Sequence, residues 1–166
     1  MPDNIRMVLI GELVVSSDRS ETLAVHGLGS CVVVAMYDPR LRIGGMLHCL
    51  LPADPWGSGG AKPTRFVESG VPLLVAALAR SGAAPDRLHA YLCGGAQVVA
   101  VPGRHDEANV GRRNVEAAEA ALRAARVPLR ARSTGGTRGL SVKLEIASGR
   151  LTIKTIGQAE QLLAPV

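Results

Sequence analysis

Two short apolar runs, separated by four turn-forming residues, constrain the fold of this chain more than any other feature. The first run, 31–38, is rich in valine, and the second, 43–51, is mostly apolar but contains His48. Runs of this length that are rich in apolar and β-branched residues are typical of buried strands. The segment 39–42 begins with Pro39 and suits a tight connection. The sequence therefore predicts a buried antiparallel hairpin.

This hairpin places a cysteine and a histidine on one face of the sheet. If the turn is centred between Pro39 and Arg40, Cys31 lies directly opposite His48, with Cβ atoms about 4.5–5.5 Å apart. Cys49 then points to the other face, because side chains alternate along a strand. A thiol beside an imidazole is the minimum unit of cysteine nucleophilic catalysis, since the imidazole takes the thiol proton. The same pair also fits a buried structural cysteine and a hydrogen-bonded core histidine.

Hydrophobic periodicity predicts further strands and two helices outside the hairpin. The expected strands are 7–16, 22–26, 88–93, 127–131, 140–146 and 151–156. The expected helices are 64–80 and a second one that begins at Asn109 or Asn114 and runs to about residue 126. Because hairpins predominate over repeating strand–helix units, we expect an α+β fold.

Length, charge and aromatic content narrow the classes of function. A chain of 166 residues favours a single domain over residues 1–166. Its net charge of +5 is compatible with nucleic acid, with an acidic protein partner or with a merely solvated arginine-rich surface. One tryptophan, two tyrosines and one phenylalanine are too few to stack along a single strand. No nucleic-acid-binding motif is present, so we expect no nucleic-acid partner.

Hydropathy and cysteine content bear on localisation and on metals. No apolar run approaches the length of about 20 residues that crosses a bilayer, so we expect no membrane insertion. Three cysteines without metal-like spacing favour a reducing cytoplasm. His26, Cys31, His48 and Cys49 are potential zinc ligands, but neighbouring residues of a strand point in opposite directions. We therefore predict neither a metal site nor a cofactor.

The residues around the cysteine belong to a longer set of motifs. Residues 27–32 are Gly-Leu-Gly-Ser-Cys-Val, and residues 44–52 contain Gly-Gly-Met, then the histidine and then Leu-Pro. Further along the chain come Gly-Gly-Ala at 94–96, Asn-Val-Gly-Arg-Arg-Asn-Val-Glu-Ala at 109–117 and Thr-Gly-Gly at 134–136. In type and order these motifs cover most of the chain. The sequence resembles CheD, the family of chemoreceptor glutamine deamidases of bacterial chemotaxis.

This resemblance implies a fold and a set of roles. The implied fold is a mixed β-sandwich flanked by helices, similar to the cysteine hydrolase domain of the deamidating bacterial toxins. Cys31 is implied as the nucleophile and His48 as its general base, converting a receptor glutamine to glutamate through a thioester. Ser30 matches a family position beside the nucleophile, where it is expected to orient the site or to form a structural turn. Three glycines are expected to lie near the substrate: Gly29, Gly94 and Gly95.

The chain departs from the family pattern at a position that concerns the histidine. The family usually has a threonine six residues before the cysteine, where it orients the histidine, and Val25 stands there. Because valine has no hydrogen-bonding side chain, His26, Thr22 or a backbone carbonyl is expected to take this role. Loss of an orienting group lowers the rate without removing nucleophile or base. The departure therefore concerns the level of activity, not the class of reaction.

The resemblance also implies partners. These are the cytoplasmic domains of chemoreceptors as substrate and a CheC-type phosphatase as a further candidate partner. Two alternatives to the deamidase stay open. One is a weakly active or inactive regulator that binds receptors or a CheC-type phosphatase. The other is a receptor methylesterase, or another thiol amidohydrolase, that uses the same thioester chemistry.

Overall fold

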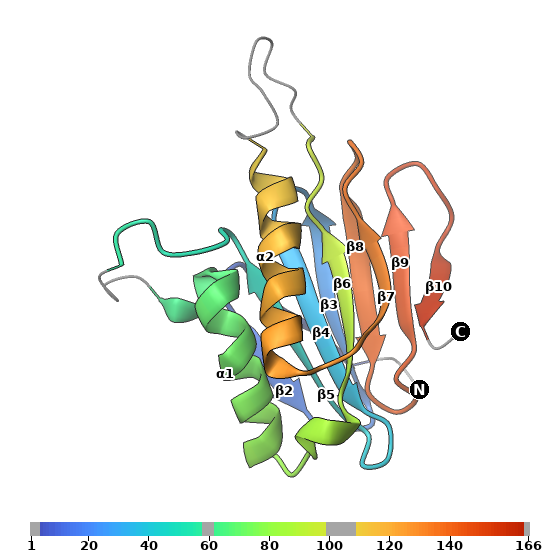
Figure 1. Ribbon diagram of the computed structural model, residues 1–166. Coiled ribbons are helices and arrows are strands. Elements are labelled where there is room, and N and C mark those ends of the chain that lie inside the picture. Colours follow the sequence, from blue (N-terminus) through green and yellow to red (C-terminus); the bar gives the residue numbers. More distant parts are fainter. Residues whose placement is uncertain (1–3, 58–61, 99–108, 165–166) are drawn as a thin grey trace.

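The computed structural model describes residues 4–57, 62–98 and 109–164, and within them ten strands form two five-stranded mixed sheets (Figure 1). Sheet A has the order β1 (Asn4–Met7), β3 (Glu21–Leu28), β8 (Leu140–Glu145), β9 (Leu151–Thr155) and β10 (Gln161–Ala164). Sheet B has the order β2 (Leu13–Ser16), β5 (Ile43–Cys49), β4 (Val32–Asp38), β6 (His89–Gly94) and β7 (Leu129–Thr134). The β1–β3 and β6–β7 pairs are parallel, and the other pairs are antiparallel.

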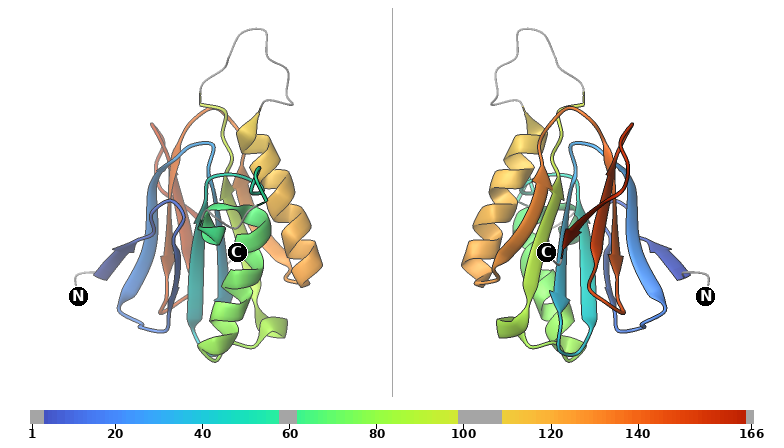
Figure 2. Two further views of the ribbon diagram at one scale, coloured as in Figure 1. Left: turned by 90° about the vertical axis from the view of Figure 1, so that its left-hand side faces the viewer. Right: turned by 90° about the vertical axis from the view of Figure 1, so that its right-hand side faces the viewer.

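The two sheets pack face to face, and both long helices cover the outer face of sheet B (Figure 2). One apolar cluster lies between the sheets and includes Leu23 and Val142 from sheet A and Val33 from sheet B. A second cluster lies between sheet B and the helices and includes Val34 and Leu74. The predicted α+β sandwich is therefore confirmed, with its helices on one side only.

The helices are α1 (Val67–Arg80) and α2 (Val110–Ala125), with short 3-10 turns η1 (Pro63–Arg65) and η2 (Pro85–Arg87). Asn109 caps α2, because its side chain accepts a hydrogen bond from the backbone N–H of Arg112. Helix α2 connects β6 to β7, and this parallel crossover is a strand–helix unit that the sequence did not predict. No helix among the described residues is long and apolar enough to cross a membrane.

The central hairpin forms as predicted, but its register differs. Val33 lies opposite His48, so the predicted pairing of Cys31 with His48 is wrong. The turn is centred between Arg40 and Leu41, because the loop is closed by an Asp38–Ile43 pair. This shift moves the partner of His48 by two residues, from Cys31 to Val33. Since side chains alternate with a period of two, Cys31 stays on the predicted face.

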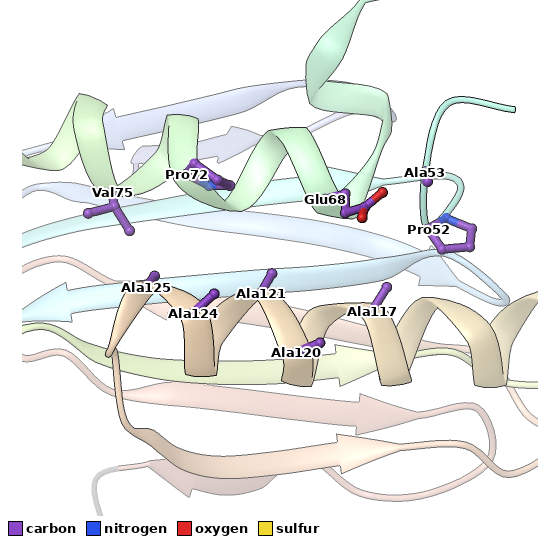
Figure 3. A pocket seen from close by; sticks show the side chains of 10 residues that line it. All are labelled: Pro52, Ala53, Glu68, Pro72, Val75, Ala117, Ala120, Ala121, Ala124 and Ala125. Atoms are coloured by element: carbon purple, nitrogen blue, oxygen red, sulfur yellow. The ribbon is translucent and has the colours of Figure 1, made fainter. Parts of the chain in front are cut away.

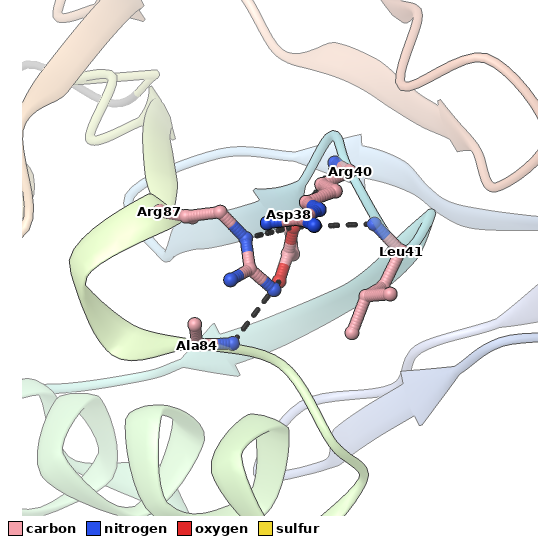
Figure 4. A network of polar contacts seen from close by, with 5 residues as sticks. All are labelled: Asp38, Arg40, Leu41, Ala84 and Arg87. Carbon is pink, nitrogen blue, oxygen red and sulfur yellow. Dashed lines mark hydrogen bonds and ion pairs between the residues drawn. The ribbon is translucent and has the colours of Figure 1, made fainter.

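Asp38 explains where the turn begins. Its carboxylate accepts hydrogen bonds from the backbone N–H groups of Arg40 and Leu41, at 3.0 and 3.3 Å (Figure 4). It also binds the backbone N–H of Ala84 at 3.0 Å and the guanidinium of Arg87 at 2.7 and 3.1 Å. Burial alone raises the pKa of Asp38, but these donors outweigh it and lower the pKa to about 2. A buried carboxylate thus joins the hairpin turn to η2.

The beginning of the chain also departs from the prediction. The single strand expected over 7–16 is two strands, β1 and β2, which belong to different sheets. The link between them turns at Gly11, whose φ is +78°, so the chain crosses from sheet A to sheet B there. The backbone N–H of Val8 still bonds to Ala24 of sheet A, at 2.8 Å. This crossing brings Val8 close to His48.

Candidate active site

Cys31 lies in a bend directly before β4, with only 9% of its surface exposed. It belongs to the apolar cluster between the two sheets, together with Val33 of β4. Burial raises the pKa of its thiol above the usual 9.0, and a hydrogen bond from its own backbone N–H opposes that change. Cys31 is therefore a protonated thiol at neutral pH.

The backbone around Cys31 is held from the end of β6. The N–H of Gly95 bonds to the Cys31 carbonyl at 2.9 Å, and the N–H of Ala96 bonds to the Gly29 carbonyl, also at 2.9 Å. Gly94 packs so closely that a Cβ atom there would lie 2.3 Å from the Cys31 carbonyl oxygen, and its φ is +104°. Only glycine fits at such a position. Gly29, Gly94 and Gly95, which are expected to lie near the substrate, thus all contact or flank the backbone of Cys31.

His48 is held on both its backbone and its ring. The N–H of Gly11 bonds to the His48 carbonyl at 2.8 Å, and the His48 N–H bonds to the Glu12 carbonyl at 3.1 Å. Nδ1 of the ring lies 3.0 Å from the carbonyl oxygen of Val8. Because a carbonyl only accepts, Nδ1 carries the proton, and the neutral ring keeps Nε2 as a free acceptor. Burial lowers the pKa of His48 below 6.5, against smaller opposing effects of the Val8 carbonyl and Glu12.

The two side chains share one face without lying opposite each other. Cys31 comes two residues before Val33, which pairs with His48, so Cys31 and His48 are diagonal neighbours. Diagonal neighbours lie about 7–8 Å apart, with Cβ atoms somewhat closer, within reach of a side chain as long as histidine. The pKa of one group is raised and that of the other is lowered. Cys31 and His48 are therefore both neutral at rest, and they lie on the same face of sheet B, where Nε2 of His48 is able to accept a proton.

The other proposed orienting residues lie elsewhere. His26 lines one hollow and Thr22 another, and Lys143 contributes to both. These hollows lie on the opposite face of sheet A from Val25, which belongs to the cluster between the sheets. His48 instead donates a hydrogen bond from Nδ1 to the Val8 carbonyl, which corresponds to the backbone carbonyl among the expected orienting groups. Ser30 is exposed at the bend before Cys31.

One further side chain at this site was not singled out by the sequence. Asn114 of α2 is fully buried, and its Nδ2 donates to the carbonyls of Ser30 at 2.9 Å and Leu50 at 3.0 Å. The sequence offered it only as a helix cap. The available signal was its spacing from Ala118 and Leu122, which puts a polar residue on the buried face of the helix. The Val8 carbonyl, a backbone group, has no side-chain signature.

Cys49 does not join the site as a ligand. Cys49 packs under the helices, with its Sγ 3.6 Å from the Thr64 carbonyl oxygen, and so faces away from the cluster that contains Cys31. His26 lies on a different face again. The four potential zinc ligands are thus not brought together. Across the described residues, no three His, Cys, Asp or Glu side chains are placed to hold a metal ion.

An apolar hollow lies away from this pair, between α1 and α2 (Figure 3). It has a volume of about 780 Å³ and contains no nucleophile or histidine. Its lining is Pro52, Ala53, Glu68, Pro72, Val75, Ala117, Ala120, Ala121, Ala124 and Ala125. This hollow therefore offers no group for the chemistry that a thiol and an imidazole perform.

A buried cysteine and a histidine with one free ring nitrogen, on an α+β sandwich, define a candidate thiol hydrolase. The family model described as "CheD chemotactic sensory transduction" matches residues 50–155. A protein of Symbiobacterium thermophilum named "Probable chemoreceptor glutamine deamidase CheD" is 41% identical over 93% of this chain and 94% of its own. "Chemoreceptor glutamine deamidase CheD" of Thermotoga maritima is 38% identical over 95% of this chain and 96% of its own.

A third relative is "Probable chemoreceptor glutamine deamidase CheD 2" of Geobacter metallireducens, which is 42% identical over 90% of this chain and 92% of its own. The chain belongs to the CheD family. Among solved structures, the crystal structure of the hypothetical protein YfiH of Bacillus licheniformis aligns with a TM-score of 0.48 at 16% identity. That alignment covers 81% of this chain and 58% of YfiH.

Proposed function

We propose that this chain is a protein-glutamine deamidase that converts glutamines in the cytoplasmic domains of chemoreceptors to glutamate. The observation that carries the proposal is the ring of His48, whose Nδ1 is bound by the Val8 carbonyl. This contact leaves Nε2 unprotonated on the face that also holds Cys31. The names of the relatives, which are chemoreceptor glutamine deamidases, supply the substrate.

In the first half of the proposed reaction, Nε2 of His48 takes the proton of the Cys31 thiol. The sulfur attacks the side-chain amide carbon of a glutamine, and the carbonyl oxygen becomes an oxyanion. His48 then gives its proton to the amide nitrogen, the carbon–nitrogen bond breaks and ammonia leaves. The product of this half is a thioester between Cys31 and the glutamyl side chain.

In the second half, water takes the place of ammonia. His48 accepts a proton from the water as its oxygen attacks the thioester carbon. The carbon–sulfur bond breaks, and His48 returns the proton to the sulfur. The balance is glutamine and water in, glutamate and ammonia out, with the thiol and imidazole restored. No metal or cofactor is needed at any step.

The net charge of the protein, and the charge that deamidation adds to the receptor, support a role in receptor adaptation. The chain has a net charge of +5, which favours encounter with an acidic partner. Deamidation replaces a neutral amide of the receptor with a carboxylate, so it adds negative charge where the enzyme acts. Because the proposed substrate is a receptor cytoplasmic domain, we propose that the protein acts in the cytoplasm, with a CheC-type phosphatase as a second partner.

The test is to incubate the native protein with cytoplasmic receptor fragments and to measure ammonia and methanol. We expect ammonia, together with conversion of specific glutamines to glutamate by site-resolved mass spectrometry. Methanol without ammonia would identify a methylesterase instead. Binding of receptor or CheC-type phosphatase with neither product would identify a regulator and overturn the proposal.

A further inference from the structure

We propose that Asn114 is a positioning residue, which holds the Ser30–Cys31 peptide so that the Cys31 N–H donates to the oxyanion of the reaction. The inference rests on the proposed function, because an oxyanion forms only if Cys31 attacks an amide. It assigns a role to a side chain on α2, far in sequence from both the cysteine and the histidine. The role is argued from contacts, burial and peptide geometry.

The contacts of Asn114 join the two segments that carry the candidate catalytic pair. Its two amide hydrogens go to the carbonyl of Ser30 at 2.9 Å and to that of Leu50 at 3.0 Å. Ser30 directly precedes Cys31, and Leu50 follows His48 by two residues. Both partners are acceptors, so the amide nitrogen must face them, and the orientation of the side chain is fixed by its chemistry.

These contacts take over where the strand pairing stops. The β4–β5 ladder ends at the Val32–Cys49 pair, and Cys31 lies beyond it in a bend. If the strand pairing continued, Cys31 would pair with Leu50. Asn114 instead bridges the carbonyls of Ser30 and Leu50, next to the point where this pair would form. The bend can therefore leave the sheet without losing its position relative to β5.

The Ser30 contact also fixes the direction of the Cys31 N–H. Carbonyl and N–H of one trans peptide point in opposite directions, so a hydrogen bond to the Ser30 oxygen sets where the Cys31 N–H points. That N–H lies against its own sulfur. A carbon attacked by this sulfur brings its oxygen to the same place. Polarisation of a peptide by a bond to its carbonyl also strengthens its N–H as a donor.

The neighbouring peptides are held in the same way. The Gly29 carbonyl is bound by the N–H of Ala96, and the Cys31 carbonyl by the N–H of Gly95. With Asn114 on Ser30, three consecutive carbonyls each accept a hydrogen bond from outside the bend. Such a preorganised backbone holds its donors in place before charge develops, as transition-state stabilisation requires.

The burial of Asn114 argues against a role in packing alone. The side chain is 0% exposed on a helix face shared with Ala118 and Leu122. Its Oδ1 is buried and has no hydrogen-bond partner among the described residues. An unpaired buried acceptor costs stability, so an apolar residue would suit the helix better. The amide is explained by the two carbonyls that it holds.

The experiment compares Asn114→Leu and Asn114→Asp with the native protein. We expect Asn114→Leu to lower kcat for deamidation by about 100-fold, with KM nearly unchanged, since oxyanion donors act in the transition state. The carboxyl group introduced by Asn114→Asp offers at most one donor, and only when protonated, so its kcat should fall between the other two. Alkylation of Cys31 by iodoacetamide forms no oxyanion, so its rate should change by less than about threefold.

The matched control is Leu122→Ala, which loosens the same helix face without reaching the bend. We expect it to lower the melting temperature but to leave kcat within about threefold of the native value. Unchanged kcat in Asn114→Leu, or an equal loss in deamidation and alkylation, would overturn the inference alone. A native protein that releases no ammonia would instead overturn the proposed function and the role of Asn114 with it.

Discussion

Nδ1 of His48 in sheet B lies 3.0 Å from the carbonyl oxygen of Val8, and this contact joins the two sheets beside Cys31. Val8 is itself anchored to sheet A, because its N–H bonds to the Ala24 carbonyl at 2.8 Å. Within the part of the chain that the structure describes, the ring of the candidate base is therefore oriented by a backbone carbonyl. A backbone carbonyl does not ionise and cannot be removed by a side-chain substitution, so we expect the orientation of His48 to tolerate Val25, where the family pattern has a threonine.

This arrangement predicts the pH dependence of deamidation. Burial lowers the pKa of His48 below 6.5 and raises that of Cys31 above 9.0. The neutral pair is the reactive form, so kcat/KM should be flat near neutral pH and should fall only below pH 6.5 as His48 gains a proton. Steady-state rates across the pH range check this. An acid limb with an apparent pKa above 6.5 would contradict it.

Replacing Val25 with the family's threonine should not raise the rate. Since the Val8 carbonyl already holds Nδ1, we expect Val25→Thr to change kcat by less than about threefold. Val25 is buried between the sheets, so a hydroxyl there should lower the free energy of unfolding by about 1–3 kcal/mol. Val142→Thr, at the paired position of β8, is the control for the buried hydroxyl. A tenfold gain in kcat for Val25→Thr alone would show that His48 is poorly oriented.

Gly94→Ala should damage the site through the backbone of Cys31. Its φ of +104° is unfavourable for alanine, and the new Cβ would lie 2.3 Å from the Cys31 carbonyl oxygen. We expect the free energy of unfolding to fall by about 2 kcal/mol or more. We also expect kcat to fall by more than the smaller fraction of folded protein accounts for. Gly157→Ala is the matched control, because φ there is +82° but the nearest atom is 3.6 Å away. Equal effects of the two substitutions on kcat would refute the steric argument.

Asp38→Asn should weaken the fold in a pH-dependent way. Hydrogen bonds from Arg87 and from backbone N–H groups lower the pKa of Asp38 from 3.8 to about 2, despite its burial. A carboxylate with a lowered pKa contributes stability above pH 3.8, and this contribution is lost as pH falls through about 2. We therefore expect Asp38→Asn to lose about 2 kcal/mol at neutral pH and progressively less in acid.

Urea unfolding at several pH values measures the difference between native protein and Asp38→Asn. Glu116→Gln is the control, because Glu116 pairs with Arg112 on an exposed helix surface, with 61% and 57% of the side chains exposed. Its effect should stay within about 0.5 kcal/mol at every pH. A constant Asp38→Asn deficit down to pH 2 would contradict the assigned pKa.

The hydrophobic pattern predicted an α+β fold and its hairpin, because alternation and β-branched runs report burial directly, whereas the sandwich was implied by the resemblance to CheD. The register of the hairpin depends on the side chain of Asp38, which binds the turn, and on Arg42 with its φ of +57°. Neither effect is visible in hydrophobicity. The split of β1 from β2 depends on a turn at Gly11 that periodicity alone does not distinguish from a bulge. The short strand β10 has four residues and no alternation, and was missed for that reason.

The candidate site likewise has features that the sequence predicts and features that depend on the tertiary structure. Motif and strand alternation put Cys31 and His48 on one face, and the two-residue change of register left that face unchanged. The group that orients His48 is the backbone carbonyl of Val8, in the segment that follows β1, and no residue type signals it. Asn114 does carry a signal, a polar residue at a helical core position. What it binds depends on how α2 packs against the bend, which only the tertiary structure gives.

The central claim is that Cys31 and His48 together convert glutamine to glutamate. The most direct test is site-resolved mass spectrometry of receptor fragments after incubation with native protein, Cys31→Ala or His48→Ala, each first shown to be folded by circular dichroism. We predict conversion by the native protein, none by Cys31→Ala and a loss of at least about 100-fold for His48→Ala. Conversion by Cys31→Ala at the native rate would contradict the account.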